Sequence, residues 1–157
     1  MVKIAVAEEM ILKIGNKGFT LVEMIVVLAI IGIILGVSLP FFSQFIASAR
    51  LKTAVRDVVT TLSAARSYAI TKRADCSVVF DLEKEQYWIE ILGSVLEKKN
   101  KTPEGIDLLD TTFSSHRVTF LPTGALIGSS GSITIIDKGG RTKLVRVINV
   151  TGKIKVE

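Results

Sequence analysis

The sequence predicts an α+β protein in which one long N-terminal helix precedes a β-rich domain. Three observations support this fold class. A run of apolar residues from Phe19 to Phe42 contains a single charged residue, Glu23. Apolar residues then recur at alternating steps of four and three as far as Ala69, which is helical spacing. Beyond Arg73, short apolar segments alternate with glycine-containing turns, which is typical of strands.

The composition limits the kinds of protein that fit. The chain has 157 residues, a mean hydropathy of +0.47 and 48% hydrophobic residues, and the apolar excess lies mostly between Phe19 and Phe42. Cys76 is the single cysteine, so an internal disulfide is impossible; with no Cys/His cluster we expect neither a zinc site nor another cofactor. The net charge of +5 favours an ordinary solvated surface, with a surface for phosphate or acidic partners as the alternative.

The apolar segment is predicted to cross a membrane. As a helix, residues 19–42 would extend ~36 Å, which exceeds the ~30 Å hydrocarbon core of a bilayer. Three lysines precede the segment, and no charge follows Glu23 before residue 50, so we expect the N-terminus in the cytoplasm. A cleaved secretory signal peptide fits less well, because the apolar run is too long and no A-x-A-like site follows it.

The helical pattern continues past the apolar segment. The predicted helix runs from about Thr20 to about Arg73, ~80 Å at the usual rise, and its second half, residues 43–73, is amphipathic. Its apolar stripe consists of Leu51, Val55, Val58, Leu62, Ala65 and Ala69.

Residues 74–157 are predicted to form the β-rich domain, as an antiparallel sheet or sandwich. A polar segment with proline and glycine, Glu97–Gly105, is expected to be a loop. Six strands are expected, at Ser77–Leu82, Gln86–Leu92, Arg117–Pro122, Ser132–Ile136, Lys143–Val150 and Lys153–Glu157.

The sequence GFTLVE, from Gly18 to Glu23, follows a basic residue and opens the apolar run. This arrangement resembles the class III signal of type IV pilins and type II secretion pseudopilins. The resemblance implies cleavage between Gly18 and Phe19 by a membrane prepilin peptidase, N-methylation of Phe19, and a cytoplasmic leader at residues 1–18. Because Met10 opens a basic leader of nine residues, MILKIGNKG, we hypothesise that translation starts there. A precursor whose mass begins at Met1 would refute this.

Glu23 needs an explanation, because a carboxylate costs ~2.5–3.5 kcal/mol at the centre of a membrane helix and less near an end. Cleavage before Phe19 would create an ammonium four residues away, in the same layer of the membrane. That ammonium can pair with Glu23 within one helix or between staggered subunits. The resemblance implies the intersubunit pair, used when a subunit joins a filament. A proton relay is the alternative, but the segment lacks a second ionisable residue.

Gly32, Gly36 and Pro40 are spaced four apart and share one helix face. The glycines match GxxxG, which permits close helix approach, and Pro40 removes a backbone donor and crowds the carbonyl of Gly36. We interpret these residues as a packing or flexibility element, although the ordinary composition of membrane helices explains them nearly as well.

Three later segments are similar to the GspH/FimT group of minor pseudopilins and minor pilins. They are AARSYAITKR at Ala64–Arg73, VTFLPTGAL at Val118–Leu126 and RVINVTGKIKV at Arg146–Val156. In addition, GSITIID at Gly131–Asp137 resembles the strand that follows the second segment in that group. The resemblance leaves residues 97–113 without support and implies a pilin-like fold. For the individual side chains of Ala64–Arg73 we favour helix packing, with Arg66 capping or pairing at the surface.

The resemblance implies a minor pseudopilin of type II secretion, anchored in the inner membrane with its C-terminal domain in the periplasm. Its expected partners are other pilin-like subunits, the prepilin peptidase and N-methyltransferase, the assembly platform and membrane lipid. The alternative is a minor type IV pilin in pilus assembly or DNA uptake. Residues 138–156 contain six cations and no acid, so Arg146, Lys153 and Lys155 are candidate phosphate contacts. A charged solvated face is the favoured interpretation of these cations.

Catalysis is not expected. His116 is the only histidine and lies at a predicted loop-to-strand entry, where exposure is the common outcome. The sequence has no nucleophile elbow, no P-loop and no metal-binding spacing of histidines.

Overall fold

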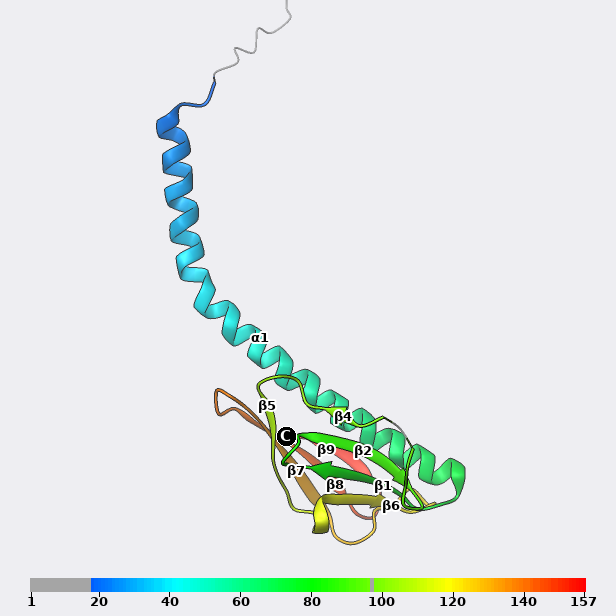
Figure 1. The fold of residues 1–157 in the computed structure, drawn as a ribbon. Coiled ribbons are helices and arrows are strands. Elements are labelled where there is room, and N and C mark those ends of the chain that lie inside the picture. Colours follow the sequence, from blue (N-terminus) through cyan, green and yellow to red (C-terminus); the bar gives the residue numbers. More distant parts are fainter. Residues whose placement is uncertain (1–17, 97) are drawn as a thin grey trace, which may run out of the picture. The chain divides into compact units, whose positions relative to one another are not determined.

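The computed structural model describes residues 18–96 and 98–157, apart from the side chains of residues 38–41 and 43. The chain divides into two compact units, Met1–Pro40 and Phe41–Glu157, and each is described by itself. Helix α1 spans Leu21–Lys72 and contributes residues to both units (Figure 1). Its bounds agree within one residue with the helix expected from the sequence. α1 ends where Arg73 turns left-handed, with φ of 52°.

In the second unit, α1 buries the stripe predicted from its spacing. All six residues of the stripe are at most 6% exposed, and Ala54 and Thr61 extend the buried face. Polar residues such as Lys52 and Arg56 stay exposed on the opposite side. Small alanines near the end of the helix let it lie close to the strands, because their side chains need little space.

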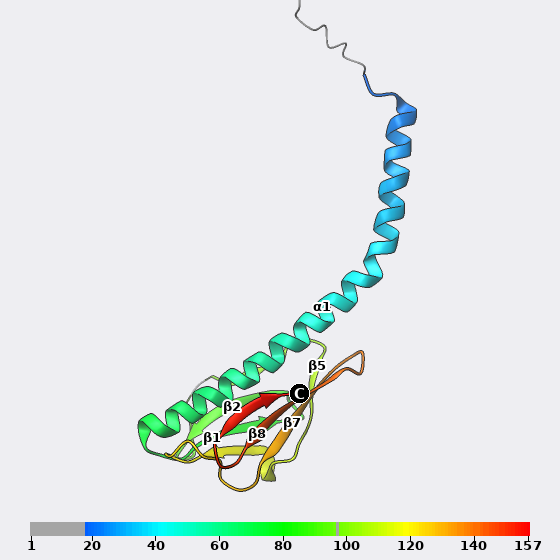
Figure 2. The same ribbon diagram turned by 180° about the vertical axis from the view of Figure 1, so that it is seen from behind.

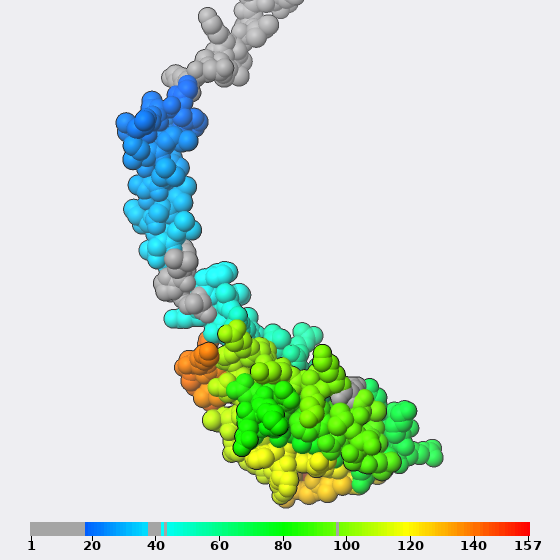
Figure 3. Space-filling model, viewed as in Figure 1, coloured from blue at the N-terminus to red at the C-terminus, as the bar shows by residue number. Residues whose placement is uncertain are grey.

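The first sheet is built from β1 (Cys76–Asp81), β2 (Gln86–Ile91), β3 (Ser94–Val95), β4 (Asn100–Lys101) and β6 (Arg117–Phe120). All pairings are antiparallel; the order is β3–β2–β1–β6, and β4 also pairs with β2. Alternate residues of β1 face the core: Cys76, Val78 and Phe80 are buried. Figure 3 shows the green segments, which include β1 and β2, forming much of the visible surface of the second unit.

The second sheet contains β5 (Ile106–Thr111), β7 (Gly131–Asp137), β8 (Thr142–Ile148) and β9 (Lys153–Val156), in the order β5–β7–β8–β9. All its pairings are antiparallel, and β9 forms one edge (Figure 2). The inward residues of both sheets join the buried stripe of α1 in one hydrophobic core. The predicted α+β fold, with one long helix and an antiparallel β-rich domain, is therefore confirmed.

Three strands were not expected from the sequence. β3 and β4 are two residues each, and β5 is a full strand inside the region left unassigned. β5 contains two aspartates, which disfavour strands, and its register shifts between Leu108 and Asp110. At that irregularity two exposed residues, Leu109 and Asp110, follow one another, so the alternation of buried and exposed residues that indicates a strand is broken.

A short 3₁₀ turn at Ser114–His116 leads into β6, and Ser115 and His116 both have positive φ. His116 is exposed, as expected, and its Nδ1 lies 3.0 Å from the hydroxyl of Thr111.

Candidate functional site

The N-terminal motif lies at the start of α1. Gly18, Phe19 and Thr20 precede the helix in non-helical conformation, and all three are exposed. Phe19 is 75% exposed. The Gly18–Phe19 peptide bond therefore lies in an open segment next to a helix start, which is the kind of backbone that a peptidase can extend into its active site.

Thr20 caps α1. Its side-chain oxygen accepts a hydrogen bond from the backbone N–H of Glu23 at 3.2 Å, and its carbonyl accepts one from Met24 at 3.2 Å. Thr20 and Glu23 have the spacing of a capping box, S/T-x-x-E. The positive end of the helix dipole also favours a carboxylate in the first turn. The Thr20 cap, which bonds the backbone N–H of Glu23, was not predicted from the sequence, although the pattern T-x-x-E is visible in GFTLVE.

The apolar half of α1 presents its side chains to the outside. From Leu21 to Val37, its large apolar residues range from 43% exposed at Val27 to 75% exposed at Leu21. A helix that is apolar on all sides is normally covered by other helices or by lipid. In the part of the chain that the structure describes, no helix combines the length and the apolarity that crossing a membrane requires.

Gly32 and Gly36 lie in this half of the helix, and a methyl group built on either one would meet no atom within 4 Å. Their small size therefore serves no packing against the described residues of the chain. The side chain of Pro40 lies outside the described residues, and so does the leader up to residue 17. The packing role of the three residues stays a prediction.

The three segments that suggested the GspH/FimT group meet in the second unit. Arg66 on α1 donates from Nε to the carbonyl oxygen of Gly124 at 3.0 Å. Gly152 is buried against the same carbonyl, and a Cβ at that position would overlap this oxygen and lie 3.0 Å from Arg66 Nε. Arg66 is half-buried and bonds to backbone. Because Gly124 follows β6 and Gly152 precedes β9, this cluster links the helix to both sheets.

The candidate phosphate contacts gather on the outer face of the second sheet. Arg146 and Lys155 are directly opposite in the β8–β9 register, and Lys153 is opposite Ile148. Arg146 forms a salt bridge with Glu157 at 3.1 Å, which reduces its availability to an anion. Lys153 and Lys155 are exposed. Lysines on an edge strand are also a common guard against unwanted strand pairing.

The turn between β7 and β8 is fixed by a buried carboxylate. Asp137, whose side chain is 2% exposed, pairs with Arg141 at 2.6 Å and accepts hydrogen bonds from its backbone N–H and Nε at 2.9 and 2.7 Å. Burial opposes ionisation, but the hydrogen bonds and charge of Arg141 outweigh it and hold the pKa of Asp137 below its usual value.

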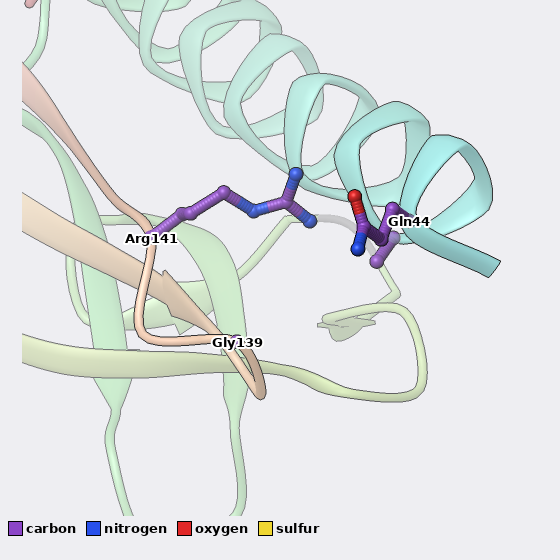
Figure 4. A pocket seen from close by; sticks show the side chains of 4 residues that line it. Gln44, Gly139 and Arg141 are labelled. Atoms are coloured by element: carbon purple, nitrogen blue, oxygen red, sulfur yellow. The ribbon is translucent and has the colours of Figure 1, made fainter. Parts of the chain in front are cut away.

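A cavity of ≈ 390 Å³ lies beside this turn, lined by Gln44, Ala47, Gly139 and Arg141. Figure 4 shows the side chain of Arg141 extending toward the part of α1 that carries Gln44. Among the described residues that line this cavity there is no nucleophile and no general base.

Comparison with known proteins fits this arrangement. Residues 54–152 match the family described as type II transport protein GspH. The chain belongs to this family. Residues 14–39 of this GspH-family protein also match the prokaryotic N-terminal methylation motif. No curated protein matches the sequence.

Solved structures with the same fold include two minor subunits. The type IV minor pilin FimU of Pseudomonas aeruginosa is 20% identical, with a TM-score of 0.60; the match covers 72% of this chain and 92% of FimU. The minor pseudopilin EpsH of Vibrio cholerae is 15% identical, with a TM-score of 0.57; the match covers 69% of this chain and 96% of EpsH. These likenesses concern the fold.

The resemblance to the GspH/FimT group is therefore confirmed. As a member of the GspH family, the protein is a structural, pilin-like subunit and not an enzyme. Its N-terminal methylation motif indicates a membrane-anchored subunit of a pilus or pseudopilus.

Proposed function

We propose that this protein is a minor pseudopilin of a type II secretion system, built into a periplasmic pseudopilus. The observation that carries this proposal is the combination of an N-terminal methylation motif with a GspH match over residues 54–152. The protein acts by assembly: α1 anchors the subunit in the inner membrane and enters the filament core, and the β-rich domain faces the periplasm.

Maturation starts at the open segment before α1. The prepilin peptidase cuts between Gly18 and Phe19, and the new amino group of Phe19 is methylated. The exposure of Gly18 and Phe19 supports this step, since no part of the described chain covers them. The mass of the mature subunit tests it: we expect the chain to begin with N-methylated Phe19, and an unmethylated or uncut chain would contradict it.

Glu23 then holds the subunit in register. Its carboxylate pairs with the ammonium of Phe19 in a neighbouring subunit, in surroundings of low dielectric constant where a charge pair discriminates strongly between registers. The exposed apolar half of α1 supports this, because other subunits or lipid must cover it. Gly32, Gly36 and Pro40 allow close packing or local loosening of the helix.

A secretion assay tests the function. In the organism that carries the gene, its deletion is expected to reduce export of type II cargo, and the wild-type gene but not Glu23→Ala is expected to restore it. Thr20→Ala is the matched control, because it alters the helix cap and leaves the carboxylate. Full export without the gene would contradict the proposal.

A minor type IV pilin is the second candidate, since the fold of FimU matches at least as well as that of EpsH. In that case deletion would reduce piliation or DNA uptake and leave export unchanged. The solvated cations Lys153 and Lys155 are candidate DNA contacts only in this alternative.

A further inference from the structure

The second sheet ends at β9, and a groove runs between this edge strand and α1. The groove has a volume of ≈ 440 Å³. Its helix wall includes Val59, Ser63, Ser67 and Ile70, and its strand wall includes Ile154. In the described part of the chain no further strand pairs with the outer side of β9.

The hydrogen-bond ladder shows which backbone groups of β9 face the groove. Leu144 and Glu157 exchange both backbone hydrogen bonds, at 3.0 and 2.9 Å. In an antiparallel pair, residues alternate between bonded and non-bonded positions. Ile154 and Val156, opposite Val147 and Val145, are therefore non-bonded. Their N–H and C=O groups point away from β8, toward the open edge.

The helix wall leaves room along this edge. Ser63 and Ser67 are small and exposed, and the hydroxyl of Ser63 is already satisfied by the carbonyl of Val59 at 2.7 Å. Apolar surface of Val59 and Ile70 lies on the same wall. A chain in the groove thus meets backbone donors and acceptors on one side. On the other side it meets a helix surface that combines the apolar Val59 and Ile70 with the small polar Ser63 and Ser67.

Charge limits which chain fits. Lys153 and Lys155 are exposed on the outer face of β9, and the groove lining contains Arg66 and Lys153 but no carboxylate. Opposite charges at cross-strand positions stabilise a pair, and like charges directly opposite destabilise it. A second copy of β9 would place lysines beside lysines, so the edge disfavours pairing with itself.

We propose that the free edge of β9 docks an extended acidic segment of another protein chain, which adds a strand to the second sheet. Its backbone pairs with Ile154 and Val156. Its outward side chains are Asp or Glu, beside Lys153 and Lys155, and its inward side chains are apolar, against Val59 and Ile70. This contact does not depend on cleavage, on Glu23 or on filament entry. A test of peptide binding at β9 can therefore fail without contradicting the proposed function, and the reverse also holds.

Peptide binding by the purified full chain in detergent micelles tests the proposal. The probe is a fluorescent seven-residue peptide that alternates Asp or Glu with Val or Ile, and anisotropy reports binding. Peptides with Lys at the charged positions, or with methylated backbone nitrogens, are the comparison probes. We expect the acidic peptide to bind at least tenfold more tightly than either.

Charge reversal gives a sharper result. The double variant Lys153→Glu, Lys155→Glu is expected to lose its affinity for the acidic peptide and to bind the lysine peptide instead. The control variant Lys52→Glu, Lys98→Glu makes the same change in net charge at exposed positions outside the groove lining. It is expected to bind the acidic peptide like the wild type. Equal loss in both variants would overturn the proposal.

Val156→Pro separates strand pairing from simple attraction of anions. Its N–H makes no bond to β8, so proline removes an edge donor at little cost to the sheet. We expect weaker peptide binding with unchanged thermal stability, and peptide-induced slowing of amide exchange at Ile154 and Val156 in the wild type. Binding that is unaffected by proline, or a DNA duplex that binds as tightly as the peptide with no change in exchange, would overturn the proposal.

Discussion

Gly152→Ala, at a buried turn, is expected to destabilise the protein more than Gly140→Ala at an open turn. Gly152 has φ of +58°, a conformation that costs an L-residue about 1–2 kcal/mol. The added methyl group would also overlap the carbonyl oxygen of Gly124, which accepts the hydrogen bond from Arg66.

The overlap forces the turn before β9 away from the loop after β6. The Arg66 hydrogen bond is then lost, and hydrogen bonds to charged groups contribute about 1.5–3 kcal/mol. Adding the backbone cost gives a loss of about 2.5–5 kcal/mol in the free energy of unfolding. That is a large part of the 5–15 kcal/mol stability of a typical domain.

Urea denaturation followed by Trp88 fluorescence measures this loss. Gly140→Ala is the matched control: Gly140 has φ of +78°, and a Cβ there meets no atom within 4 Å, so it carries the backbone cost alone, about 1–2 kcal/mol. Arg66→Ala should cost less in the Gly152→Ala background than in the wild type, because the bond is already broken. If Gly152→Ala costs no more than Gly140→Ala, the reasoning about this cluster is wrong.

Three further changes test other contacts. Asp137→Asn removes a carboxylate whose pKa is lowered in the folded protein. The stability that this carboxylate contributes is present above its usual pKa and is lost as the pH falls. The free energy of unfolding of the variant should therefore fall less than that of the wild type on acidification below about pH 5. The neighbouring carboxyl of Asp107 raises the pKa of Glu85, and partial desolvation raises it further. The stability that the protonated Glu85 contributes is present at low pH and is lost as the pH rises through the raised pKa. Asp107→Asn should therefore stabilise the protein near pH 7 and have less effect near pH 4. Thermal unfolding at both pH values measures this difference. Thr20→Ala should weaken the start of α1 by about 0.5–2 kcal/mol, seen as faster amide exchange at Glu23; unchanged exchange would contradict the cap.

Much of the candidate site could be predicted from the sequence, because it depends on residues that are neighbours in the chain. The order of residues from Gly18 to Glu23, the apolar run and the later family segments needed no tertiary information, and the family match agrees with them. The same local pattern also contained the Thr20 cap, which explains part of why Glu23 is tolerated at the start of an apolar helix. Its pairing with Phe19 of another subunit stays a prediction.

β5 shows where sequence reasoning failed. A bulge shifts the alternation of apolar residues, and Asp107 and Asp110 lower the apparent strand preference. The strand forms because β7 supplies the hydrogen-bond partners and the core buries Ile106 and Leu108. Nonlocal pairing of this kind outweighs intrinsic propensity.

By itself, the sequence determined the long helix, its buried stripe and the family, because periodicity and motif order are properties of neighbouring residues. Only the tertiary structure decided that Arg66, Gly124 and Gly152 meet, since Arg66 and Gly124 are 58 residues apart and Gly152 lies far from both in the chain. Only the structure decided that β9 ends a sheet next to a groove. A strand's position in its sheet depends on which other strands pair with it, and no local pattern in KIKV records that.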